Sequence, residues 1–149
     1  MMKKHLLFFL ALMATMTAAD AQVYKVVTII ESIVPGGIGR SRMIETKTEL
    51  DYDEFSTERT DGKKSNQGDI RRRDIKVDEF EETKMLNFYS LTGINFQNIA
   101  SNDALIASKM NELTEKGWEL FHIASAVESD AGETDGNGIF ITRLFFRRP

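Results

Sequence analysis

Residues 101–127 constrain the fold most, because a helix pattern, a glycine and a strand pattern follow one another there without a linker. Apolar residues first recur at spacings of three and four, the pattern of one face of an amphipathic helix. Gly117 then supplies the left-handed conformation that commonly ends a helix. Residues 118–127 carry apolar side chains at both odd and even positions, which favours a strand with apolar residues on both faces. We therefore expect a helix over 101–116, capped by Ser101, that leads directly into a strand.

Three other runs complete the expected sheet. Residues 23–34 are rich in Val, Ile and Thr, carry apolar residues on both parities and end at a Pro-Gly-Gly turn, which favours a central strand. Residues 43–55 alternate apolar or β-branched residues with charged ones and are expected to form a hairpin with that strand. Residues 139–146 are expected to form a second hairpin with 118–127 across a polar, glycine-rich loop.

The segment 51–84 interrupts this pattern, since more than half of its residues are charged. Such a segment buries little apolar surface. We expect a charged, mobile excursion near 56–70. An exposed strand over 69–80 is then expected to lead back to the core, and a helix over 78–89 is the alternative.

The expected fold class is α+β, an antiparallel sheet of about four to five strands with one main helix packed on one face. One helix of about four turns covers only part of the available aromatic surface. Uncovered apolar surface of this kind commonly meets a partner, so a homo-oligomer or an unknown protein partner is expected. The surplus aromatic residues are Phe96, Phe121, Phe140, Phe145 and Phe146.

Residues 1–21 have the three parts of a secretory signal peptide: two lysines, an apolar stretch of about 11 residues, and small residues before a cleavage point after Ala21. The apolar stretch is shorter than the roughly 20 residues of a membrane span. Residues 22–149 are then a single exported domain, periplasmic or extracellular, without a stable membrane span. Loss of the signal changes the net charge from −4 to −5, which disfavours nucleic-acid binding.

The chain contains no cysteine, which excludes disulfides, cysteine-based metal sites and thiol nucleophiles. Cleavage would also remove one of the two histidines and leave His122 alone. No cofactor is expected, and no residue is assigned a catalytic role. The protein is therefore expected not to be an enzyme.

Residues 113–120 (LTEKGWEL) and the final Arg-Arg-Pro after an aromatic strand resemble a family of small bacterial domains of unknown function. Members carry L-x-x-x-G-W-E-L after a helix and finish on an aromatic strand ending in K/R-R-P. The opening Tyr-Lys-Val-Val at 24–27 is also similar. The resemblance covers 101–149 well and implies a fold; the family has no established reaction, so function stays open.

Two weak ligand-binding candidates lie elsewhere in the chain. In the loop 35–42, glycines could expose backbone N–H groups to an anion, and Arg40 and Arg42 could clamp a phosphate or carboxylate. The alternative is a hairpin turn with solvated arginines. His122 could act as a general base beside Ser125 or Glu128, or could be an ordinary strand histidine.

The loop 128–138 offers oxygen ligands of the kind that calcium prefers. Their spacing does not match the EF-hand pattern, and the alternative is a loop whose polar residues supply turn geometry. The weak metal candidates are Asp130, Glu133, Asp135 and Asn137.

The leading functional expectation is an exported, non-enzymatic domain that binds a partner or self-associates in the cell envelope. One alternative is an exported hydrolase that uses His122 or the carboxylates of 128–137. The other alternative is a binder of anions or small ligands through the 35–42 loop.

Overall fold

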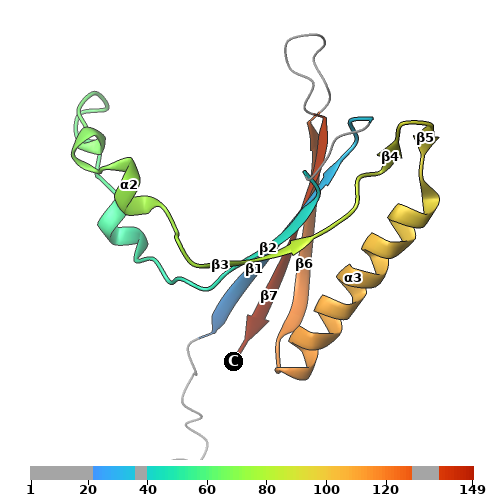
Figure 1. Cartoon of the computed structure of the whole chain (residues 1–149). Helices are drawn as coiled ribbons and strands as arrows, with labels where there is room; N and C mark the ends of the chain where they lie inside the picture. Colours follow the sequence, from blue (N-terminus) through green and yellow to red (C-terminus); the bar gives the residue numbers. More distant parts are fainter. Residues whose placement is uncertain (1–21, 36–39, 129–137) are drawn as a thin grey trace, which may run out of the picture.

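The computed structural model describes residues 22–35, 40–128 and 138–149 (Figure 1). Its strands are β1 (Val23–Ser32), β2 (Arg42–Thr46), β3 (Phe80–Lys84), β4 (Tyr89–Ser90), β5 (Gly93–Ile94), β6 (Glu119–Glu128) and β7 (Ile139–Arg148). Its helices are the long α3 (Phe96–Glu115), the single turn α2 (Arg72–Ile75) and two 3-10 turns, Tyr52–Phe55 and Gln67–Asp69.

Five strands form one antiparallel sheet in the order β3-β2-β1-β7-β6, and β4 and β5 form a small second sheet. β1 pairs with both β2 and β7 and is the central strand, as expected. The β1–β2 and β6–β7 pairings confirm both expected hairpins. Helix α3 runs along one side of the sheet (Figure 1), which confirms the α+β fold with one main helix.

Helix α3 begins at Phe96, so the expected start near Ser101 was wrong. The N-cap is Asn95, whose side chain accepts hydrogen bonds from the backbone N–H groups of Gln97 and Asn98 at 3.1 and 3.2 Å. The first turn presents an exposed Phe96 and contributes only the half-buried Asn98 and Ile99 to the face toward the sheet. Ser101, the expected N-cap, lies inside the helix.

The C-terminal end of α3 matches the expectation. Gly117 has a φ of 82°, in the left-handed region. Its N–H donates to the carbonyl of Thr114 at 2.9 Å, and the N–H of Trp118 donates to the carbonyl of Leu113 at 3.0 Å. These two bonds make a Schellman motif, which satisfies the last carbonyls of the helix and turns the chain straight into β6.

The core lies between α3 and one face of the sheet. Because strand side chains alternate between faces, burial of Leu144 and Phe146 on β7 means that Phe145 points away from α3. The same alternation on β1 turns Val26 away while Val27 is buried. The buried apolar residues are Val27, Ile29, Met43, Met85, Leu113, Trp118, Leu144 and Phe146.

The buried side chains of β2 are Met43 and the charged Glu45. Met43 faces the core opposite Ile29, and Glu45 is buried two residues further on. The Glu45 carboxylate forms ion pairs with Lys25 of β1 and with Lys109 of α3, the latter at 2.6 Å. Desolvation would raise the pKa of Glu45, but hydrogen bonds from the two lysines outweigh it and hold that pKa below its ordinary value. The ion pairs thereby join β1, β2 and α3.

Asn102 makes a second polar connection inside the core. Its fully buried side chain accepts from the Leu86 N–H at 2.9 Å and donates to the Leu86 carbonyl and to Glu31 Oε1, each at 2.8 Å. Burial raises the pKa of Glu31, and the hydrogen bond from Asn102 only partly opposes this effect. Asn102 thus links α3, β1 and the segment that follows β3.

Residues 47–79 leave the sheet as an excursion that extends away from it (Figure 1). The strand expected over 43–55 ends at Thr46, and the strand expected over 69–80 was wrong, as was the alternative helix over 78–89. Only 80–84 forms a strand there. The excursion has few apolar residues to bury, so its backbone hydrogen bonds close locally in short turns.

Candidate interaction surface

The face of the sheet opposite α3, here called the open face, carries half-buried and exposed apolar side chains. Tyr24 is 61% exposed and Val26 is 37% exposed at one end of it. Most members are half-buried because they pack only against one another within the sheet. The apolar residues of the open face on β1, β2 and β7 are Tyr24, Val26, Ile30, Ile44, Ile141 and Phe145.

A β-bulge adds two consecutive residues of β6 to the open face. The register between β6 and β7 shifts between Leu120 and His122, which makes Phe121 the extra residue. The Phe121 ring lies 5.8 Å from the Tyr24 ring and 6.4 Å from the Phe145 ring. His122 is opposite Phe145, with ring centroids 5.6 Å apart. Regular alternation would place Phe121 and His122 on different faces.

Tyr24, Phe121, His122 and Phe145 therefore form an aromatic cluster from three strands. The Tyr24–Phe121 and Phe121–Phe145 pairs are edge-to-face, an arrangement that aromatic quadrupoles favour. Phe121 remains 43% exposed, and His122 is exposed as well. The cluster is thus held in place by its own contacts while its outer surface faces solvent.

Arg147 borders the cluster. Its guanidinium lies 5.5 Å from the centre of the Phe121 ring and donates two hydrogen bonds to Glu119, at 2.9 and 3.1 Å. These hydrogen bonds hold the pKa of Glu119 below its ordinary value. A fixed arginine beside exposed aromatic rings is the residue combination that is enriched at protein interfaces.

The structure separates the groups that a hydrolase based on His122 would need. Ser125 lies on the α3 side of the sheet, where its Oγ is 2.8 Å from the Oγ1 of Thr142. Glu128 lies six residues along β6 from His122, a distance of about 20 Å at about 3.3 Å per residue. Simple strand alternation would put His122 on the same face as Trp118, but the bulge turns His122 to the open face while Trp118 is buried in the core.

The two arginines of the expected anion clamp lie in different settings. Arg42 belongs to β2 and forms an ion pair with Glu82 of β3. Two strands separate β2 from β6, so Arg42 and His122 do not share a site. Arg40 is exposed, and the neighbouring residues 36–39 lie outside the described residues.

The four calcium candidates, Asp130, Glu133, Asp135 and Asn137, also lie outside the described residues. Over 22–35, 40–128 and 138–149, no group of three or more His, Asp or Glu side chains is placed to hold a metal ion. Across those same ranges, none of the helices has the length and apolar character needed to cross a bilayer.

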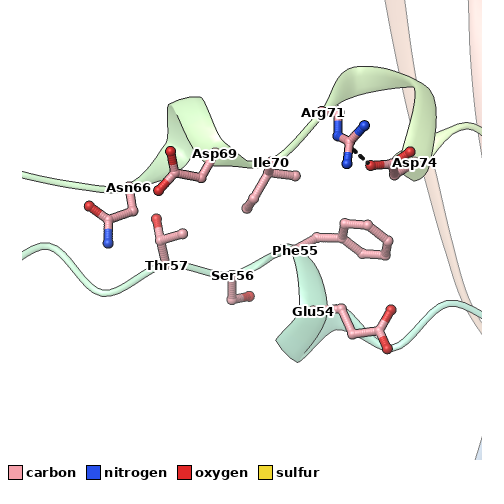
Figure 2. A pocket seen from close by; sticks show the side chains of 9 residues that line it. All are labelled: Glu54, Phe55, Ser56, Thr57, Asn66, Asp69, Ile70, Arg71 and Asp74. Carbon is pink, nitrogen blue, oxygen red and sulfur yellow. Dashed lines mark ion pairs between the residues drawn. The ribbon is translucent and has the colours of Figure 1, made fainter.

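A hollow of about 420 Å³ lies in the excursion, between the segments 54–57 and 66–74 (Figure 2). Arg71 on its wall is ion-paired with Asp74 at 3.5 Å. Close by, Gln67 Nε2 donates a hydrogen bond to Thr57 Oγ1 at 2.9 Å, which joins the two segments. The hollow is therefore explained as the seam between the two halves of the excursion, and no motif in the sequence marks it.

Comparison with known proteins returned no match to a family model, a curated protein or a solved structure. The resemblance to the small bacterial domains remains a prediction.

Proposed function

We propose that the protein is an exported, non-enzymatic domain that binds a protein partner or a second copy of itself in the cell envelope. The aromatic cluster on the open face carries this proposal. Its Tyr24 and Phe121 rings are exposed although the chain has a core in which aromatic residues are buried, as Phe146 and Trp118 show. Covering such a surface contributes about 25 cal/mol for each Å² of apolar area removed from water.

The geometry also favours binding at low entropic cost. The rings of Tyr24, Phe121 and Phe145 support one another, and Glu119 holds Arg147 in place. Side chains that are ordered before association lose little freedom on binding. A preorganised cluster of this kind suits a binding surface better than a catalytic site, which would need a nucleophile or an acid–base pair.

Export is supported by the signal pattern of residues 1–21. Expression of the full chain in a bacterial host, followed by cell fractionation and intact-mass analysis, tests it. We expect a periplasmic or secreted product that begins at Gln22. A full-length product confined to the cytoplasm would contradict export.

The binding role is tested with the exported protein and a fluorescent anilinonaphthalene sulfonate dye, together with its mass in solution by light scattering. We expect the folded protein to bind the dye or to self-associate. Tyr24→Asp combined with Phe121→Asp should abolish dye binding or self-association at the open face. The matched control is Tyr52→Asp, at a residue that is 74% exposed in the excursion, and it should change nothing. A monomer that binds no dye would refute the proposal.

A further inference from the structure

The two edges of the main sheet differ sharply. β3 forms one edge with only five residues, three of them charged. Two of these charges are paired: Glu82 with Arg42 of β2, and Glu81 with Lys47, the residue after β2, at 3.0 Å. Short, charged edges are a common protection against pairing with other chains.

The β6 edge has none of that protection. β6 is ten residues long and carries no Asp, Glu, Lys or Arg between Glu119 and Glu128. On the α3 side, Ile123 is 52% exposed and Val127 is 57% exposed, and Phe121 is exposed on the open face. Among the described residues, no strand pairs with the outer side of β6. An edge strand that presents apolar side chains on both faces is a template for another strand.

The bulge defines which part of this edge is regular. From His122 to Glu128 the register with β7 continues without interruption, and Ser125 is the midpoint of this part. We infer that β6 pairs antiparallel with β6 of a second copy, about a two-fold axis at Ser125. The two five-stranded sheets would then form one continuous sheet. This inference rests on the proposed function and names the partner.

The residues that this register brings together are complementary. Ile123 lies opposite the partner's Val127, so the two most exposed large apolar side chains of β6 cover each other. His122 lies opposite the partner's Glu128, which pairs a histidine with a carboxylate on the open face. Ala124 lies opposite the partner's Ala126, so small residues face each other on the open face. Directly opposite residues place their Cβ atoms about 5 Å apart, within reach of such contacts.

Neighbouring registers lack this complementarity. With the axis at Ala124, Ile123 would lie opposite the partner's Ser125, and His122 would lie opposite an alanine. With the axis at Ala126, Val127 would face serine instead. A two-fold axis perpendicular to the sheet also places both α3 helices on one side and both aromatic clusters on the other. Pairing at Ser125 therefore extends the open face across two molecules.

The absence of cysteine makes this register directly testable. Ser125→Cys places two thiols opposite each other at the axis, within the Cα separation of 4.4–6.8 Å that a disulfide requires. We expect mild oxidation of the exported protein to give a covalent dimer rapidly. Ile123→Cys is the matched control, since its two copies would be about 13 Å apart along the strands. Mixing Ile123→Cys with Val127→Cys should restore cross-linking.

Light scattering and sedimentation of the unmodified protein should show a dimer, and Glu128→Lys should raise its dissociation constant about tenfold. Ser125→Cys cross-linking no faster than that of Ile123→Cys would overturn the inference. A monomer that still binds the dye would overturn it and leave the proposed function standing. A dimer that is lost in Tyr24→Asp/Phe121→Asp, with no Ser125→Cys cross-link, would place the contact on the open face and also overturn it.

Discussion

Replacement of Asn102 by alanine tests whether the buried amide holds the core together. The change removes three hydrogen bonds of 2.8–2.9 Å, two with the backbone of Leu86 and one with Glu31. At about 1 kcal/mol for each bond, Asn102→Ala should lower the free energy of unfolding by about 3 kcal/mol at pH 7. At roughly 4 °C per kcal/mol for a domain of this size, the melting temperature should fall by roughly 12 °C.

The loss should also depend on pH. Because burial raises the pKa of Glu31 above its ordinary value of 4.5, this carboxyl favours the folded state below that pH and penalises it as the pH rises. Asn102 reduces the penalty by donating to the carboxylate. Asn102→Ala should therefore destabilise the protein less at pH 4 than at pH 7. In a Glu31→Gln background, the cost should vary little with pH.

Trp118 supplies the assay, since it is the single tryptophan and is buried in the core. Its fluorescence can follow urea denaturation for each variant at pH 4 and pH 7. Asn111→Ala is the matched control: this exposed asparagine lies on the same helix, and the change should stabilise the protein slightly through helix propensity. Equal midpoints for Asn102→Ala and Asn111→Ala at pH 7 would refute the reasoning.

Three further predictions follow from the charges and the backbone. Glu45→Gln should lower the free energy of unfolding by about 3 kcal/mol at pH 7. Because the pKa of Glu45 is lowered in the folded state, the difference in urea midpoint between wild type and variant should shrink as the pH falls below about 4. A difference that stays constant with pH would contradict the ion pairing. Gly117→Ala should cost about 1 kcal/mol by urea denaturation, owing to the positive φ alone, since the added Cβ would meet only Arg148 Cδ at 3.8 Å. Carboxyl NMR titration should give Glu112 a pKa of about 2, and Lys116→Met should raise it; an unchanged value would show that this lysine does not supply the main hydrogen bond.

Features of the fold that depend on local pattern could be predicted from the sequence. The β-rich runs of β1, β6 and β7 and the helix stop at Gly117 each have a signal within a few residues. The burial of Glu45 could not be predicted, because its partner Lys109 lies on a distant helix. For the same reason, the alternation along β2 does not indicate that Met43 and Glu45 are the buried side chains.

The candidate surface was predictable only in outline. The surplus of phenylalanine indicated an uncovered sheet face, but of the five surplus residues only Phe121 and Phe145 lie on it. Phe146 is buried in the core, Phe140 is on the α3 side and Phe96 belongs to α3.

The surplus also did not identify Tyr24 or Arg147 as members of the surface. Their neighbour Phe121 reaches the open face through a bulge, a one-residue shift in pairing that leaves no mark in the hydrophobic alternation. The pairing of β6 with β7 therefore determines which side chains of β6 lie on the open face.

The central position of β1 has a consequence for when the protein can fold. Val23 pairs with Arg148, so the middle of the sheet joins segments more than 100 residues apart. Loops of that length close slowly, whereas α3, β6 and β7 are consecutive and can assemble early. A chain that crosses a membrane with its N-terminal end leading would therefore have β1 on the far side before its partner β7 arrives. In such a chain, the β1–β7 pairing that completes the sheet could form only after β7 has crossed.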